Sequence, residues 1–345
     1  MWRRLAYLVA GLALFVSALG LMREGAAALV PRLEGSVFTD NAWSTLGLGW
    51  LGACIVLSGS PVAASALSLL DGGAIDRTQA FTMLTGSRLG AAFVVLVVGV
   101  VYAVRGGAGG RRAPSSIGIL SLLVTACVYV PGAVAGYLLL DGGALDGMRI
   151  GTSPSLTSAT DFLFGWSVDA ADAVLPGWAL FPLGLGVLLA GFQLFDRVLP
   201  SVGSERLEGR PDDAWHTRKW PMFLVGCGVC LLTLSVSVAL TVLVPLVAKG
   251  YLRRANTLPY IAGANITTLA DTLVAAILLG NQDAVRVVAA VTVTVTVWTL
   301  VLLAFAYPLL RRVCLGIARR ALESRQRLVV FAAALFVVPV ALIIV

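Results

Sequence analysis

Two short serine motifs, each set in a long apolar stretch, are the first residues in this sequence with an evident chemical use. The motifs Ser58-Gly59-Ser60 and Ser235-x-Ser237 lie 177 residues apart. Such residues break or re-cap helices, and their hydroxyl groups can bind a cation or donate hydrogen bonds to an anion. A helix that restarts at such a break directs its N-terminal N–H groups there, which favours an anion. We therefore treat Ser58, Gly59, Ser60, Ser235 and Ser237 as candidate substrate-binding residues.

Polar residues in a second pair of apolar stretches complete the candidate site. Arg88 lies in the first stretch, and Asn265, Thr267, Thr268 and Asp271 lie in the second. Charged groups at membrane depth are costly and usually functional. Arg88 could pair with an anion or replace a bound Na⁺, whereas Asp271 and Asn265 offer the oxygen ligands that hard cations prefer. An equally supported alternative is a buried Arg88–Asp271 salt bridge with no ligand role, because a buried charge needs a partner.

An internal repeat relates these two sets of residues. Residues 57–86 align without gaps on residues 234–263, and the identical positions include small and charged residues, which apolar bias does not explain. The two repeat units, called the first and second copies below, extend over 42–104 and 219–281. The identical pairs are Leu57/Leu234, Ser58/Ser235, Ser60/Ser237, Leu69/Leu246, Gly73/Gly250, Arg77/Arg254 and Gly86/Gly263.

The small and polar residues inside each copy predict broken or re-entrant helices. The predicted breaks lie at 58–61, 86–90 and 263–268, where Gly, Pro, Ser and Asn interrupt apolar sequence. Free backbone groups are costly in lipid, so such breaks persist only where they are buried against a cavity. Close packing of small residues is the alternative explanation for the first of these segments.

The Lys and Arg residues predict that the two copies have opposite orientations. Most of them fall near the N-terminus and in the joints 105–115, 196–219 and 311–327. Such residues mark the cytoplasmic side. The first copy ends at one basic joint and the second begins at another, which is the inverted-topology plan of secondary transporters, with a binding site near the middle of the membrane. We expect a multi-pass cell-membrane protein with a cytoplasmic N-terminus.

The composition predicts that lipid covers most of the protein surface. Of the 345 residues, 59% are hydrophobic and only 12% are charged, against about 25% charged in soluble domains. The pattern predicts an all-α integral membrane protein of about eight to ten membrane segments, with residues 1–345 as a single transmembrane domain. We expect 311–327 to be an Arg-rich linker between membrane segments. The apolar runs of spanning length cover 5–21, 42–70, 79–104, 116–140, 176–195, 220–248, 257–280, 285–310 and 328–345.

The remaining reactive side chains do not form a catalytic or metal-binding set. The only histidine, His216, lies in a charged loop, and Cys227 and Cys230 form a CxxC motif with no further Cys or His nearby. We therefore predict no enzymatic activity, no metal centre and no cofactor. The net charge of +7 is explained by topology and by lipid headgroups, so we expect no nucleic-acid partner.

At the repeated motifs the chain resembles the sodium/phosphate cotransporter family. The two repeats of that family each carry a Gln-Ser-Ser-Ser stretch and, further on, a Gly-Ala-Asn-Ile-Gly-Thr-Thr stretch. The segment 263–268, Gly-Ala-Asn-Ile-Thr-Thr, is the nearest match here. Leu57 and Leu234 stand where the family has Gln, and Arg88 stands where it has Asn. The resemblance implies Na⁺-coupled phosphate uptake, with the Ser-rich and Gly-Asn motifs forming the substrate and ion sites.

The function expected from the sequence is therefore secondary active transport. Inorganic phosphate is the expected substrate, Na⁺ the expected coupling ion and the lipid bilayer the surrounding medium. Two alternatives stay open. The first is a transporter or exporter of another small anion on the same scaffold, and the second is a degenerate homologue that no longer transports.

Overall fold

The computed structural model describes residues 2–33, 36–104, 112–147, 165–198, 218–248 and 250–345, and these residues form helices and no strands. The all-α class is therefore confirmed. The helices are α1 (Trp2–Leu33), α2 (Ala42–Val56), α3 (Gly59–Asp71), α4 (Arg77–Ala91), α5 (Phe93–Val104), α6 (Arg112–Asp141), α8 (Gly177–Val198), α9 (Lys219–Thr233), α10 (Val236–Thr241), α11 (Leu243–Ala248), α12 (Arg254–Thr267), α13 (Leu269–Leu279), α14 (Gln282–Phe305), α15 (Tyr307–Glu323) and α16 (Arg325–Ile344).

Seven helical stretches of the described residues are long and apolar enough to cross a membrane. The number is below the expected eight to ten because two predicted runs, 42–70 and 220–248, are each divided into shorter helices. Neither α2 nor α9, at 15 residues each, reaches the 17 or more residues, roughly, that a span needs. The architecture is that of a multi-pass membrane protein. The seven stretches are Val9–Leu33, Arg77–Ala103, Ser115–Asp141, Gly177–Leu194, Arg254–Leu279, Gln282–Phe305 and Arg325–Ile344.

The helix break predicted at the first serine motif is present, and the second serine motif has a break of the same backbone form. Helices α2 and α9 each end at a leucine in the left-handed region, with φ of 58° at Leu57 and 47° at Leu234. The serine that follows, Ser58 or Ser235, is extended and begins the next helix. A branched side chain rarely adopts positive φ, so the recurrence of this conformation 177 residues apart is a specific structural correspondence.

Two pairs of helices, α2 with α4 and α9 with α12, meet through glycines at corresponding positions. In the first pair, a Cβ placed on Gly49 would lie 2.0 Å from the carbonyl oxygen of Met83, and one on Gly86 would lie 2.1 Å from that of Leu46. Only glycine permits such close approach of two backbones. The second pair repeats both contacts at the same offset, with Gly226 against Tyr260 and Gly263 against Phe223.

The break predicted at 86–90 is wrong. Helix α4 continues through this segment to Ala91, and the interruption falls at Ala92, before α5 begins. The glycines there let α4 pack closely against α2, and the continuous helix satisfies its own backbone groups. In the second copy α12 runs through Gly263 and ends at Thr267, so its interruption falls at Thr268, at the end of the predicted segment.

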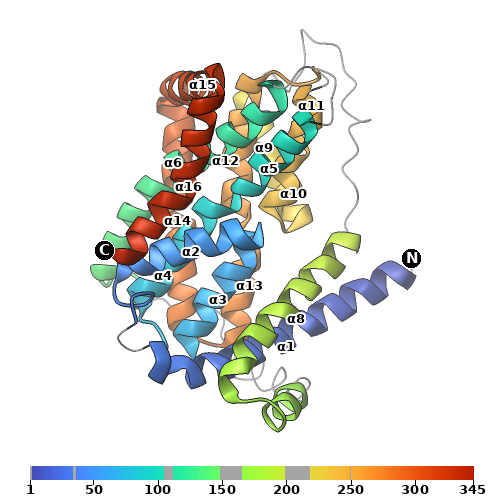
Figure 1. Ribbon diagram of the computed structural model, residues 1–345, viewed down its shortest axis with the longest axis vertical. Helices are drawn as coiled ribbons and strands as arrows, with labels where there is room; N and C mark the ends of the chain where they lie inside the picture. Colours follow the sequence, from blue (N-terminus) through green and yellow to red (C-terminus); the bar gives the residue numbers. More distant parts are fainter. Residues whose placement is uncertain (1, 34–35, 105–111, 148–164, 199–217, 249) are drawn as a thin grey trace.

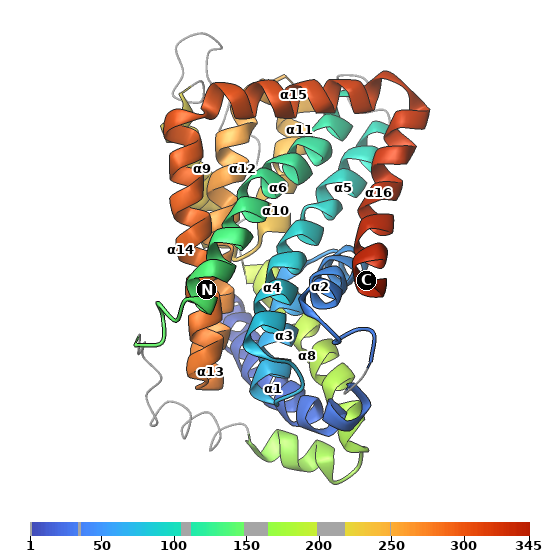
Figure 2. The same ribbon diagram turned by 90° about the vertical axis from the view of Figure 1, so that its left-hand side faces the viewer.

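Each copy contains one long span that is bent at a helix break, formed by α4 and α5 in the first copy and by α12 and α13 in the second. These two bent spans run in opposite directions along the bundle. In Figure 2, α4 lies below α5, whereas α12 lies above α13. Their contacts with α14, a helix of 24 residues and so about 36 Å long, agree with this view. Arg77 at the start of α4 binds Asp283 in the first turn of α14, at 2.8 Å. Ala255 at the start of α12 accepts a hydrogen bond from Tyr307, which lies just beyond the other end of α14, at 3.2 Å.

The segment 311–327, expected to be a linker, is largely the helix α15. It lies across one end of the bundle, at the top of Figure 2, between the spans α14 and α16. The helix is amphipathic, since Leu310, Cys314, Ala318 and Ala321 are buried while Arg311, Arg312, Arg319 and Arg320 are exposed. Helices α1 and α8 pair at the opposite end (Figure 1).

Candidate functional site

The guanidinium group of Arg88 joins the two copies in the interior of the bundle. Arg88 lies in the last turn of α4 and its side chain is only 1% exposed. Its Nη1 donates to the Thr268 hydroxyl at 3.1 Å, and its Nη2 donates to the Thr272 hydroxyl. Nη2 also lies 3.8 Å from Oδ1 of Asp271. The structure therefore contains the Arg88–Asp271 ion pair that the sequence left as one of two alternatives.

The carboxylate of Asp271 is held at the start of α13. Asp271 lies in the first turn of this helix, where the positive end of the helix dipole stabilises a negative charge. Its Oδ1 accepts hydrogen bonds from the backbone N–H and the hydroxyl of Thr272, at 2.6 and 2.9 Å. The break at Thr268 is thus what turns the chain so that an acidic helix start faces Arg88.

One donor and one acceptor of this cluster have no partner among the described residues. Arg88 Nε and Asp271 Oδ2 are both buried and make no hydrogen bond. An unsatisfied buried polar group costs about 1–3 kcal/mol, and more when it is charged. The free N–H suits an oxyanion oxygen, and the free carboxylate oxygen suits a hard cation such as Na⁺. The described residues hold no group of three or more His, Cys, Asp or Glu side chains that could bind a metal ion.

Asn265 lies in a second buried polar group, formed with α6. Its side-chain amide donates to the Thr125 hydroxyl at 2.9 Å, and its backbone carbonyl accepts from the Tyr129 hydroxyl at 2.7 Å. The side chains of Asn265, Thr125 and Tyr129 are all buried. Asn265 corresponds in the repeat to Arg88, so each copy places a polar side chain at this position of its bent span.

The serines of the two motifs lie at the helix breaks and do not hydrogen-bond to Arg88. Ser235 caps α10 by accepting from Val238 N at 3.3 Å, whereas Ser58 begins α3 without a side-chain capping bond. The hydroxyl of Ser237 donates to the carbonyl oxygen of Leu57 at 3.4 Å. The structure thus brings the two breaks into contact with each other, and the Arg88 cluster forms a separate set of contacts.

Three remaining candidates have local packing roles. A Cβ on Gly59 would lie 2.9 Å from the Ser87 carbonyl oxygen, so glycine lets α3 approach α4. Ser60 is buried in the first turn of α3. Thr267 donates to the Cys227 carbonyl oxygen at 3.1 Å, which ties α12 to α9. Of the ten predicted site residues, the structure joins Arg88, Thr268 and Asp271 directly.

Sequence reasoning missed Thr125, Tyr129 and Thr272. Each belongs to a pattern that could have identified it. Ser121, Thr125 and Tyr129 recur every four residues in an otherwise apolar run, which places them on one face of α6. Thr268, at the break, and Thr272, in α13, have the same four-residue spacing. Polar residues on one face of an apolar helix indicate contact with another polar group rather than with lipid.

Comparison with known proteins gives no match. The sequence fits no known family model, and it matches neither a curated protein nor a solved structure. The resemblance to sodium/phosphate cotransporters therefore rests on the motif residues and their spacing alone.

Proposed function

We propose that this chain is a secondary active transporter of a small oxyanion, with inorganic phosphate as the substrate and Na⁺ as the coupling ion. The observation that carries the proposal is the buried cluster between the copies, in which Arg88 keeps a free N–H and Asp271 keeps a free carboxylate oxygen. Buried charges are expensive, and within membrane spans they usually mark an ion or substrate pathway.

The proposal includes an inverted relation between the two copies. Supporting it, the equivalent residues Arg77 and Arg254 begin helices at opposite ends of α14, and the backbone conformation of Leu57 recurs at Leu234. Helices α3 and α13 pack together, as do α10 and α5, so each copy supplies one short helix to the other copy's bent span. In transporters of this plan, one unit rocks against the other around a central site.

The cluster suggests how anion and cation binding would be coupled. In the present state the charges of Arg88 and Asp271 compensate each other at 3.8 Å. A bound oxyanion would draw the guanidinium away, because Arg forms forked hydrogen bonds with phosphate. Asp271 would then be an uncompensated buried carboxylate, which costs several kcal/mol. A Na⁺ ion at Asp271 removes that cost, so each ion favours binding of the other.

A degenerate, non-transporting homologue is the second candidate, and one observation favours it. Arg88 already donates to Thr268 and Thr272 and faces Asp271, so the protein itself supplies most of its partners. In that case the ion pair would be a permanent structural element. The two candidates differ in whether the pair opens when an anion is present.

The experiment is uptake of radioactive phosphate into proteoliposomes containing the full-length chain, with and without an inward Na⁺ gradient. Wild type and Arg88→Ala are compared, with Arg312→Ala as the matched control because Arg312 is exposed on α15. The proposal predicts Na⁺-dependent uptake that is lost only in Arg88→Ala. Gradient-driven uptake of radioactive sulfate, but not of radioactive phosphate, would indicate another anion. If the gradient drives no uptake of any oxyanion, the transporter proposal is wrong and the degenerate homologue remains.

A further inference from the structure

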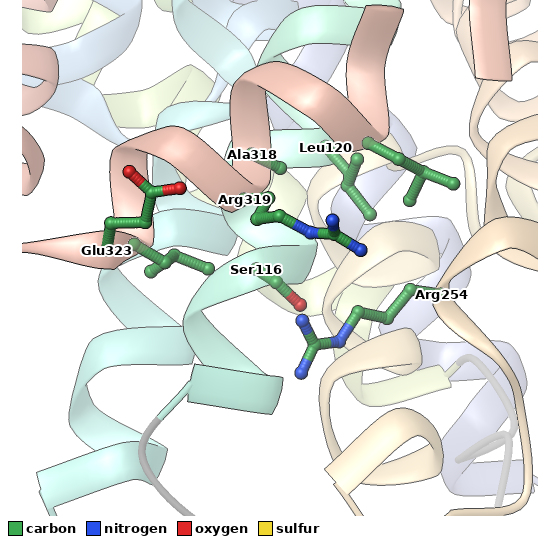
Figure 3. Close-up of a pocket in the computed structure, with 8 residues that line it drawn as sticks. Ser116, Leu120, Arg254, Ala318, Arg319 and Glu323 are labelled. Carbon is green, nitrogen blue, oxygen red and sulfur yellow. The ribbon is translucent and has the colours of Figure 1, made fainter. Parts of the chain in front are cut away.

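A pocket at the α15 end of the bundle lies apart from the Arg88 cluster. It has a volume of about 430 Å³ and is formed where α6, α12 and α15 meet. Figure 3 shows Arg254 and Arg319 extending toward each other from opposite sides, with Ser116 between them. The lining residues are Ser116, Leu120, Arg254, Leu315, Ala318, Arg319, Leu322 and Glu323.

The two arginines facing the pocket have no acidic partner among the described residues, and the acidic residue beside them, Glu323, pairs with another arginine. The ion pairs of the described chain include neither Arg254 nor Arg319, while Glu323 pairs with Arg327 one turn further along the chain. The pocket lining therefore carries two arginines, and its acidic residue, Glu323, is engaged by Arg327. Two converging guanidinium groups are the arrangement that proteins use for a phosphate group.

The corresponding arginine of the first copy differs from Arg254 in having acidic partners. Arg77, the counterpart of Arg254, is compensated by Asp146 and Asp283, at 2.9 and 2.8 Å. The residue before it, Asp76, caps α4 with its side chain. In the second copy the capping position holds Arg253, which makes no side-chain capping bond. Helix α12 thus begins with two basic residues at the positive end of its dipole, and an anion there would relieve the repulsion.

The position of the pocket indicates which anion it takes. Because α15 connects the spans α14 and α16 and lies across the end of the bundle (Figure 2), it belongs at the membrane surface. The pocket combines the arginines with an apolar wall of Leu120, Leu315 and Leu322. A free phosphate ion has no apolar part that could contact these leucines, whereas a phospholipid carries its phosphate next to glycerol and acyl chains.

We propose that this pocket binds the headgroup phosphate of an anionic phospholipid, with Arg254 and Arg319 holding the phosphate and the three leucines contacting the lipid below it. The lipid would fix α15 to the start of α12, which is the first helix of the second copy's bent span. The proposal does not depend on the transported substrate, because it concerns residues outside the Arg88 cluster.

The test measures the melting temperature of the delipidated full-length protein in detergent, together with bound lipid by native mass spectrometry. The added probes are dioleoyl phosphatidylglycerol, dioleoyl phosphatidylcholine and inorganic phosphate. Phosphatidylglycerol should raise the melting temperature of wild type. In the Arg254→Gln/Arg319→Gln double variant, both that increase and the amount of bound lipid should fall by at least half. Arg312→Gln/Arg320→Gln is the charge-matched control, since both arginines are exposed on the same helix as Arg319 and neither lines the pocket.

Three results would overturn the proposal. If Arg312→Gln/Arg320→Gln loses as much of the increase as Arg254→Gln/Arg319→Gln, the effect is general surface attraction. If phosphatidylcholine or millimolar inorganic phosphate alone reproduces the full increase, the ligand is not an anionic lipid. If both single variants retain the full increase and the lipid, the arginines do not bind it; the single variants serve as the test if the double variant does not fold.

Discussion

The hydroxyl of Ser237 donates a hydrogen bond to the carbonyl oxygen of Leu57, at 3.4 Å, across 180 residues of sequence. Leu57 lies at the first helix break, Ser237 lies in the first turn of α10 just after the second break, and the two breaks are 177 residues apart. A carbonyl oxygen at the end of a helix lacks its intrahelical partner and must find another. The second copy therefore satisfies a backbone group that the break in the first copy leaves free, which links the two breaks structurally.

The left-handed leucine at the first break predicts a specific sensitivity to side-chain shape. Leu57→Ile should lower stability by about 1–2 kcal/mol, because a β-branched residue at a φ of 58° is strongly disfavoured. Leu57→Asn should be tolerated, since Asn adopts this conformation readily. Thermal unfolding in detergent measures both, with Leu231→Ile on the exposed face of α9 as control. Equal melting temperatures for the two Leu57 variants would contradict the assigned backbone conformation.

The close approach of α2 and α4 predicts that Gly86 cannot be replaced without moving a helix. A Cβ there would lie 2.1 Å from the Leu46 carbonyl oxygen, which is backbone and cannot rotate away. Gly86→Ala should therefore cost about 2 kcal/mol or more. Gly228→Ala in α9 meets nothing within 4 Å and should be neutral or stabilising. A melting temperature of Gly86→Ala equal to that of wild type would show that the two helices are not packed so closely.

The same glycine explains why one sequence prediction was wrong. Glycine in an apolar run can either end a helix or let another backbone come close, and the sequence around Gly86 is compatible with both. Gly86 serves close packing because the Leu46 backbone lies against it. Leu46 is 40 residues away in the sequence and belongs to α2. By contrast, the break at Ser58 was predictable because proline and serine follow one another there and each acts locally.

Other features of the site were readable from patterns longer than a motif. The four-residue spacing of Thr125 and Tyr129 marks one face of α6, and the buried positions of α15, such as Leu310 and Cys314, have the same spacing. The sequence analysis predicted a linker at 311–327 because it counted the charges there and not their spacing. The partners of Arg88 depend on where α13 lies relative to α4, and only the three-dimensional arrangement shows that Thr272 is one of them.

A double-mutant cycle on Arg88 and Asp271 separates a structural ion pair from a binding site. Asp271→Leu and Arg88→Met alone should each cost about 3 kcal/mol, because each leaves a buried charge without its partner. The Arg88→Met/Asp271→Leu double variant should recover most of that stability, since apolar replacement of a buried pair is often neutral. If the residues bind substrate, the recovered double variant will still show no Na⁺-dependent phosphate uptake.

Two outcomes of that cycle would count against the coupled mechanism. Purely additive losses of stability would mean that Arg88 and Asp271 do not interact, contrary to their separation of 3.8 Å. Full uptake by the stable double variant would remove both residues from the transport site. The unfolding midpoint in detergent and the uptake assay are measured on the same protein preparations, so folding and function are read separately.

Labelling from the two sides of the membrane tests the inverted relation between the copies. In a background with the five native cysteines replaced, a membrane-impermeant maleimide should label Arg77→Cys in intact cells. It should label Arg254→Cys only after the membrane is permeabilised. The reason is that these residues begin α4 and α12 at opposite ends of α14, and the basic joints predict that the α12 end lies in the cytoplasm.

Controls make the labelling result decisive. Arg320→Cys on α15 should behave like Arg254→Cys, because Arg254 and the α15 residue Arg319 line the same pocket. Arg286→Cys should behave like Arg77→Cys, because Arg286 and Arg77 both bind Asp283. If Arg77→Cys and Arg254→Cys are labelled from the same side, the copies are not inverted and a central site between them loses its basis. If the sides are opposite but exchanged, the inversion holds and the orientation expected from the basic residues is wrong.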